Sequence, residues 1–460
     1  SMMVSGALGA SVSMIEKFYK YKSFQVAFID TAYNIGFAIF SLVLGFTVKG
    51  HKMRWVGSGI LMIALGCALF IVPVFVKPND ASSAAERIIL CLSGKPSNDD
   101  HLKICGADSY LYLMIMWLSY FLIGIGSAPL HTAAISFLDD NSPKEKIGVY
   151  TGIYYSCGAI GPLVGYLITS VFLRIHIYIK KPDDSILSSS SPNWVGAYWL
   201  TYLVGAVMTL LLSGPLLLFP SKIVKKTDSQ ESVIDNPNLT FSESIQITVL
   251  VFKNLPFLLT CGGMFFEGLM LNALSLFMSK YVEIQFSVSP QKASLLTGIV
   301  LVPSSFIGLG LGGYGTKIFA WCPKRLMKKI TIISFLCCSS LGFLFLRCEN
   351  TNLHGVKYDS GNTLIFENDM TALCNCRIGN YFPVCVNGKT YFSPCALGCK
   401  NQEGTTPDMI FSNCETTLVV NTATEGVCTA KCNALPIFLS FGFIAMILQY
   451  STYVLLINYT

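Results

Sequence analysis

Residues 54–77 read RWVGSGILMIALGCALFIVPVFVK, with a charged side chain only near each end. A membrane-spanning helix needs about 20 mainly apolar residues, so this stretch is long enough to cross a bilayer. Similar runs recur near residues 24–48, 109–138, 147–173, 194–219, 247–277, 294–320, 328–347 and 436–458. With a partial run at the start, the pattern predicts an all-α polytopic membrane protein, because helices satisfy their own backbone hydrogen bonds in lipid.

The composition of the whole chain fits this prediction. Its 460 residues are 52% hydrophobic and only 13% charged, against about 25% charged residues in a typical soluble domain. The mean hydropathy is +0.56. These values exclude disorder and argue against a single soluble domain. The net charge of +6 is not gathered in one basic block, so we expect a lipid bilayer, and no nucleic acid, as a partner.

The basic residues in the loops predict the orientation in the membrane. The loop at 49–54 carries Lys49, Lys52 and Arg54, and the loop at 317–329 is basic with no acidic residue. By the positive-inside rule both loops are cytoplasmic. Counting spans from them places both ends of the chain in the cytoplasm and residues 78–107, 174–193 and 348–432 outside.

The spans divide into two bundles. Residues 1–219 are expected to form spans one to six, 220–246 a polar cytoplasmic linker, 247–347 spans seven to nine, and 436–460 span ten. Six spans, an inner linker and further spans is the layout of many transporters built from two halves. The chain begins and ends in apolar runs, so we expect the start of span one and any later spans to lie outside this sequence.

The outer loop at 348–432 is rich in cysteine. A segment as short as 374–414 cannot enclose a large core, so three disulfides are expected to stabilise it, in an oxidising compartment. A zinc site is less favoured, because His354 is the only histidine nearby. The six cysteines of this segment are Cys374, Cys376, Cys385, Cys395, Cys399 and Cys414.

Three further cysteines flank this segment. Cys428 and Cys432 are also expected to form disulfides, and Cys348 brings the number in the loop to nine. Because nine is odd, at least one is free or bonded elsewhere, for example to Cys91 or Cys105.

The cysteine spacing and the string at 383–391, PVCVNGKTY, resemble a Kazal-type domain over about residues 370–416. Such a domain implies either a loop presented to proteases or a rigid cap over the outer vestibule of a transporter. We favour the cap, because the segment lies between two membrane spans.

The chain as a whole resembles the organic anion transporting polypeptides, a family of the major facilitator superfamily. Residues 194–203, WVGAYWLTYL, resemble the family signature, although Ser191 and Asn193 replace its usual Asp and Arg. The alternative for Trp194 and Trp199 is an interfacial aromatic belt. Residues 29–36, IDTAYNIG, and 124–130, GIGSAPL, resemble the family's second and fourth spans.

This resemblance implies a fold and a function. The fold is the two-bundle major facilitator fold, with about ten of twelve spans present, plus the small disulfide-rich Kazal-like domain. The function is sodium-independent, facilitative transport of large amphipathic organic anions by alternating access across the plasma membrane. Steroid conjugates, bile acids and thyroid hormones are the expected substrates, and bicarbonate is a candidate counter-anion for exchange.

Ionisable side chains inside the spans are the first candidates for a transport site, because each costs about 2.5–3.5 kcal/mol at the centre of a bilayer. For Glu267, in span seven, we favour a cavity-facing role in ion coupling or gating. Asp30 in span two is equally compatible with a capping role. His131 in span four either titrates near neutral pH or is a neutral, hydrogen-bonded histidine. The family resemblance expects Glu where Asn34 stands.

The remaining candidates are Tyr33, Tyr154, Phe266 and Asn272, since amphipathic anions need an apolar, aromatic cavity with few polar groups. Packing or contact with lipid is the alternative for each. The sequence shows no nucleophile–base pair, phosphate-binding loop or metal-ligand motif, so we expect no enzyme, cofactor or metal site. The alternative function is a truncated, non-transporting membrane protein whose Kazal-like ectodomain binds proteases or extracellular partners.

Overall fold

The structure is a computed structural model of the chain. It describes residues 1–47, 51–77, 108–142, 147–179, 194–220, 246, 249–319, 323–346, 348, 353–358, 364–366, 374, 376, 381–403, 409–414, 422–428 and 434–457. The expected linker at 220–246 lies almost wholly outside these residues, and Cys91, Cys105 and Cys432 lie outside them as well.

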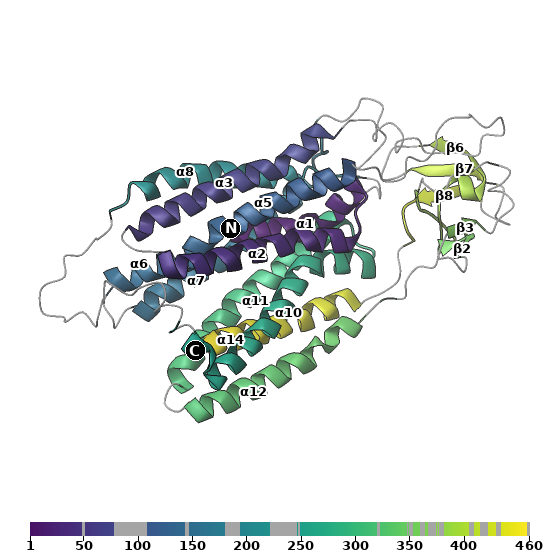
Figure 1. Cartoon of the computed structure of the whole chain (residues 1–460). Coiled ribbons are helices and arrows are strands. Elements are labelled where there is room, and N and C mark those ends of the chain that lie inside the picture. The colour runs from purple at the N-terminus through teal and green to yellow at the C-terminus, as the bar shows by residue number, and fades with distance from the viewer. Residues whose placement is uncertain are drawn as a thin grey trace, which may run out of the picture.

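The helices form two groups (Figure 1). The first group holds α1 (Met2–Tyr19), α2 (Ser23–Thr47), α3 (Lys52–Val76), α5 (Asp108–His131), α6 (Ala133–Asn141), α7 (Ile147–Phe172) and α8 (Trp199–Leu217). The second group holds α10 (Leu255–Gln285), α11 (Pro290–Phe319), α12 (Pro323–Ser340), the short 3-10 helix η2 (Leu341–Phe345) and α14 (Ala434–Ile457). Helices α1 and α7 of the first group pack against α10 and α11 of the second.

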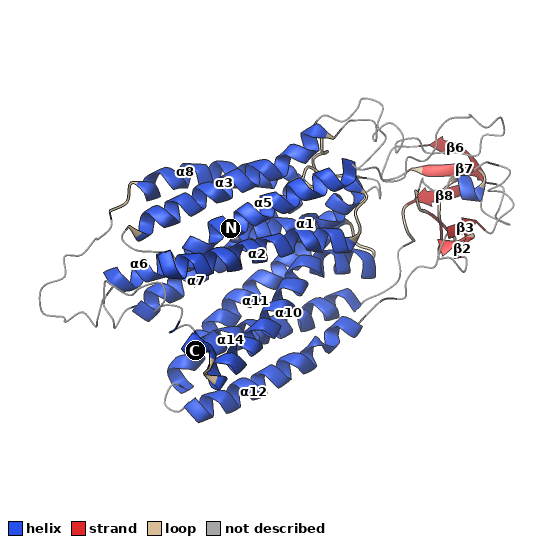
Figure 2. Cartoon of the chain, viewed as in Figure 1, coloured by secondary structure: helices blue, strands red, loops and turns tan. Residues whose placement is uncertain are grey.

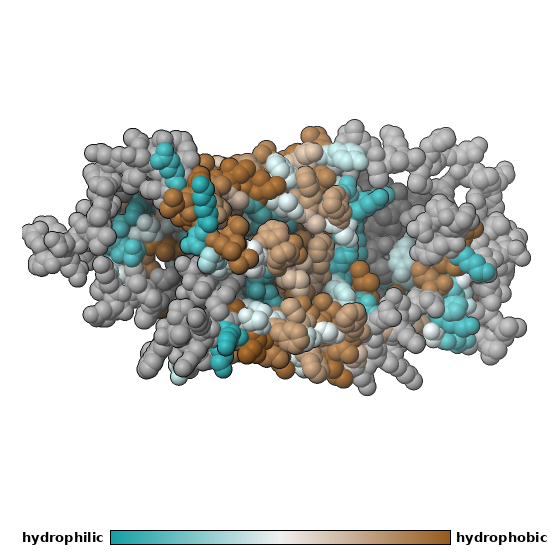
Figure 3. Space-filling view, turned by 60° about the horizontal axis from the view of Figure 1, so that its bottom comes forward, coloured by the Kyte–Doolittle hydropathy of each residue, from teal (hydrophilic) through white to brown (hydrophobic). Residues whose placement is uncertain are grey.

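Eight helices of the described residues are long and apolar enough to cross a membrane. Of the other two long helices, α7 has a shorter apolar stretch, Ile160–Phe172, and α1 carries Glu16 and Lys17 near its end. Apolar side chains cover the middle of the face in Figure 3, and hydrophilic ones lie toward both ends. Such a band suits the hydrocarbon core of a bilayer, so the expected polytopic helical fold is confirmed.

Two of the expected spans have different boundaries in the structure. The span expected at 194–219 begins only at Trp199, because the backbone of residues 195–197 pairs with that of 175–177. There His176 and Gly196 form an isolated bridge, and the Ala197 N–H donates to the Ile175 carbonyl at 2.9 Å. The span expected at 247–277 is α10, which starts after Asn254 and continues to Gln285.

Glycines let helices of the first group approach closely. A Cβ atom on Gly124 of α5 would lie 2.2 Å from the backbone oxygen of Tyr33 on α2. A Cβ atom on Gly165 of α7 would lie equally close, 2.2 Å, to the backbone oxygen of Met3 on α1. Small residues at such crossings are typical of membrane helices, whose association depends on close packing.

The chain between η2 and α14 forms a small β-domain at one end of the helices (Figure 2). We call this end of the molecule the disulfide end. A six-stranded sheet has the order β1-β5-β4-β8-β7-β6, and β2 pairs separately with β3. The strands are β1 (Leu353–His354), β2 (Val356–Tyr358), β3 (Leu364–Phe366), β4 (Val384–Val386), β5 (Lys389–Tyr391), β6 (Cys399–Glu403), β7 (Ile410–Cys414) and β8 (Thr422–Glu425).

Three disulfides hold this domain. They join Cys376 to Cys395, Cys399 to Cys414, and Cys385 to Cys428. Cys348 and Cys374 are disulfide-bonded as well.

The six cysteines of 374–414 do not pair only among themselves, because Cys385 bonds to Cys428, which was also expected to form a disulfide. The boundary of 370–416 is also too narrow. Strand β1 pairs with β5, and β8 pairs with β4 and β7, so the sheet needs residues from both sides of that range.

The glycine contact between α5 and α2 gives a test of the packing. We expect Gly124→Ala to lower the melting temperature of the detergent-solubilised chain, because its methyl group would meet backbone atoms of Tyr33 that cannot rotate away. The control is Gly45→Ala on α2, where a Cβ atom meets nothing within 4 Å. Alanine is the better helix former by about 1 kcal/mol, so this control should melt no lower than the native chain. Equal melting temperatures for the two variants would contradict the packing.

Candidate functional site

Several of the candidate residues of the first group lie along α2 and α5. The Tyr33 ring stacks on Phe37, with centroids 6.3 Å apart, and Phe37 meets the His131 ring edge-on at 5.5 Å. Tyr154 of α7 donates a hydrogen bond from its hydroxyl to the Leu130 carbonyl at 2.7 Å. The structure therefore brings Tyr33 and His131 into one aromatic row through Phe37, which was not predicted from the sequence.

The two polar candidates of α2 lie one helical turn apart. Asn34 is exposed and donates from Nδ2 to the backbone oxygen of Asp30 at 3.3 Å. Asp30 is half-buried, and its carboxylate forms no ion pair within the described residues. The Asn34 amide thus donates to the helix backbone and does not bond to the Asp30 carboxylate.

Glu267 is the candidate with the best-defined surroundings. Its Oε1 accepts a hydrogen bond from Gln449 Nε2 of α14 at 3.1 Å. Gln449 Oε1 in turn accepts one from the Cys337 thiol of α12 at 2.6 Å. Glu267 therefore links α10 to α14 and, through Gln449, to α12, all within the second helix group. Phe266 and Asn272 are both exposed on the same helix and take no part in these bonds.

Four charged residues join α1 to α10, and the sequence reasoning missed their role. Lys17 Nζ lies 3.3 Å from Glu283 Oε1, and Lys280 forms an ion pair with Glu16. The side chains of Glu16, Lys280 and Glu283 are only 13%, 17% and 16% exposed. Ser13 donates to Glu283, and Lys280 also donates to Ser23 Oγ at 2.6 Å. Opposite charges at the ends of two apolar runs were the signal available in the sequence.

Further hydrogen bonds join the two groups. The Tyr166 hydroxyl of α7 donates to the backbone oxygen of Ser275 on α10. Gln291 of α11 donates to the Leu173 carbonyl at 3.5 Å. Because α12 leads into the disulfide-bonded domain, α10 ends and α11 begins at the disulfide end. The two ion pairs and the Gln291 bond therefore lie at that end, whereas Ser275 lies farther from it along α10.

Two tryptophans of the segment 194–203 hydrogen-bond to the backbone that follows α7, beside the contact between the two helix groups. Trp194 donates from Nε1 to the Leu173 carbonyl at 2.8 Å, and Trp199 donates to the Ile177 carbonyl at 2.9 Å. The two side chains are buried, at 3% and 6% exposure, so the alternative of an interfacial aromatic belt is wrong. The Leu173 carbonyl accepts from both Trp194 and Gln291, which links this segment to the second group.

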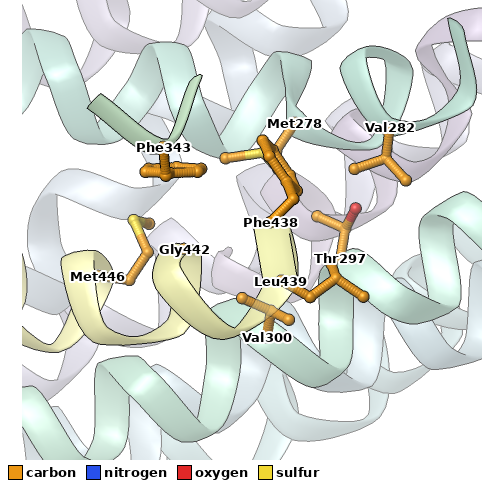
Figure 4. A pocket seen from close by; sticks show the side chains of 9 residues that line it. All are labelled: Met278, Val282, Thr297, Val300, Phe343, Phe438, Leu439, Gly442 and Met446. Carbon is orange, nitrogen blue, oxygen red and sulfur yellow. The ribbon is translucent and has the colours of Figure 1, made fainter. Parts of the chain in front are cut away.

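A small apolar pocket lies within the second group (Figure 4). Met278 and Val282 of α10, Phe343 of η2, and Phe438 and Met446 of α14 line it. None of the residues predicted from the sequence lines this pocket, and it offers no charge to an anion. In the part of the chain that the structure describes, no cluster of His, Cys, Asp or Glu could hold a metal ion.

The contact between the two helix groups separates the candidate residues into two sets. The two groups are joined at the disulfide end by ion pairs and hydrogen bonds, and such bonds can break without unfolding either group. The Glu267 network lies in the second group, and the row of Tyr33, Phe37 and His131 lies in the first. The structure therefore offers two polar or aromatic sites on opposite sides of the contact between the groups.

Comparison with known proteins assigns the chain to a family. The Organic Anion Transporter Polypeptide (OATP) family matches residues 1–457. The chain is 30% identical to human solute carrier organic anion transporter family member 4C1, over 98% of this chain and 65% of that protein. It is 26% identical to mouse member 4A1, over 98% and 66%. It is also 26% identical to human member 1B1, over 88% and 66%.

The chain thus spans about two thirds of the length of these relatives. The match to the family covers nearly every residue of the chain, and the eight apolar helices and the disulfide-rich region agree with it. The chain belongs to the organic anion transporter polypeptide family.

Proposed function

We propose that the chain transports organic anions across a membrane. Its family and the names of its relatives, all organic anion transporters, support this function. The observation that carries the proposal is the contact between the two helix groups, which is built from breakable bonds at one end. In a transporter of two halves, rocking about such a contact exposes a central site to each side in turn.

The expected topology gives this contact a direction. If the disulfide end faces the outside, the bonds between α1 and α10 close the outer side of the transporter. The disulfide-bonded domain is then extracellular, in a compartment that allows disulfides to persist, and both ends of the chain are cytoplasmic. We expect the plasma membrane as the location.

The proposed substrates are large amphipathic anions such as steroid conjugates, bile acids and thyroid hormones. The direct test is uptake of a sulfated steroid by cells that express the chain. Replacing sodium by choline in the medium should leave the uptake rate unchanged, since the proposed transport is facilitative. Loading the cells with bicarbonate should raise the rate if bicarbonate is the counter-anion. Uptake equal to that of untransfected cells would contradict the proposed function.

The ion pairs between α1 and α10 provide a second test. In Lys280→Glu, like charges meet at Glu16 in a partly buried site, and breaking a buried pair costs about 3–5 kcal/mol. We expect the closed outer contact to weaken and steroid uptake to fall at least several-fold. Adding Glu16→Lys restores an opposite pair and should recover most of the uptake.

The matched control is the ion pair between Lys52 of α3 and Asp140 of α6, 2.5 Å apart within the first group. Reversing Lys52 leaves the contact between α1 and α10 unchanged, so uptake should fall less in Lys52→Glu than in Lys280→Glu. If Lys280→Glu and the double swap transport equally well, the pair has no part in closing the outer side.

A third test concerns Glu267. Glu267→Gln keeps the size of the side chain and a hydrogen-bond acceptor for Gln449, but it cannot carry a charge. We expect a flatter dependence of uptake on pH around neutrality, with surface expression unchanged. The measurement is the initial uptake rate across a series of external pH values, normalised to surface-labelled protein. An unchanged pH profile would remove Glu267 from the mechanism.

A further inference from the structure

A chain of hydrogen bonds crosses three helices of the second group. Cys337 of α12 donates to Gln449 Oε1 at 2.6 Å, and Gln449 Nε2 of α14 donates to Glu267 Oε1 of α10 at 3.1 Å. Cys337 and Gln449 are buried, at 4% and 5% exposure. The thiol therefore fixes which end of the amide faces the carboxylate.

The amide of Gln449 can pair with Glu267 in either charge state. An ionised carboxylate only accepts hydrogen bonds, and Nε2 supplies the donor. A protonated carboxyl group donates, and it can do so to Oε1 after a half-turn of the amide. In that arrangement Nε2 faces Sγ, which is a weak acceptor. The network thus stays bonded whether or not Glu267 holds a proton.

Few other titratable groups face this site. Within the described residues they are the Cys337 thiol of α12 and the Tyr453 hydroxyl of α14, both of which lie near Glu267. Apart from Glu267, the charged side chains that the structure describes on α1, α10 and α11 lie at the disulfide end: Glu16, Lys17, Lys280, Glu283 and Lys292. The basic pair Lys328 and Lys329 lies near the other end of α12. The carboxylate is therefore held by an amide instead of a cation.

We propose that Glu267, Gln449 and Cys337 form a proton-binding site, in which Gln449 is the positioning residue. The proton comes from water and returns to water, so the site needs no other reactant. Its use in transport rests on the proposed function, with the charge of Glu267 changing as the second group moves between the two sides. The hydrogen bonds themselves do not depend on transport.

The test replaces the amide by an apolar group of similar length. In Gln449→Leu the ionised form of Glu267 loses its donor, so the protonated form is favoured and persists to higher pH. We expect the midpoint of the titration to rise by about one pH unit, the effect of one hydrogen bond to a charged group. Infrared difference spectra of the purified chain in nanodiscs report the protonated carboxyl band directly, and Glu267→Gln identifies that band by removing it.

Variants of the two neighbouring thiols separate positioning from general packing. Cys337→Ser keeps a donor to Gln449 and should leave the midpoint in place, whereas Cys337→Ala should raise it, by less than Gln449→Leu. Cys338→Ala, which changes the adjacent residue outside the network, should have no effect. The thiol variants also keep the test decisive if Gln449→Leu does not fold.

A double variant shows whether Gln449 acts through Glu267. Adding Gln449→Leu to Glu267→Gln should not change the pH profile of uptake further. A titrating band that survives Glu267→Gln, or a midpoint that Gln449→Leu and Cys337→Ala leave in place, would overturn the proton site. A band that shifts as expected while uptake is insensitive to pH would support the site and overturn its use in transport.

Discussion

Opposite charges on α1 and α10 hold two groups of helices together at one end. The pairs of Glu16 with Lys280 and of Lys17 with Glu283 are partly buried, so they gain from a lower local dielectric than exposed pairs do. Apolar contacts between these helices alone would add little in lipid, where the surrounding chains are equally apolar. The charges thus help to fix the position of the contact. The bond of Gln291 lies at the same end, and the bond of Tyr166 joins the groups farther along α10.

Much of the helical framework could be predicted from the sequence because lipid imposes a simple rule on spans. The run at 54–77 corresponds closely to α3, Lys52–Val76. The rule fails where polar partners come from elsewhere in the chain. Helix α10 continues past its apolar run because Lys280 and Glu283 find opposite charges on α1. Residues 194–198 are apolar enough for a helix, but 195–197 pair with the backbone of 175–177, and Trp194 bonds to the Leu173 carbonyl.

The candidate site shows the same limit. Glu267 could be identified from the sequence, because an acidic residue within an apolar run is rare. Its partner could not, because Gln449 is 182 positions away and lies in a span with no charge to draw notice. Disulfide pairing is also a matter of three-dimensional distance, which explains why Cys385 reaches Cys428 across strand β8. The Kazal-type resemblance, the topology and the substrate class remain predictions.

The base of the disulfide-bonded domain is tied firmly to the second helix group. The chain enters the domain after η2 and leaves it into α14, and the Phe343 and Phe438 rings of these elements are 5.0 Å apart. The Tyr281 hydroxyl of α10 also bonds to the Leu344 carbonyl at 2.6 Å. Because the chain enters and leaves the domain through elements packed in one half, we expect the domain to move with that half. A fluorophore or antibody attached to the domain would then be displaced farther than the helices themselves when the second group rotates. Its position would report a small rotation of buried helices.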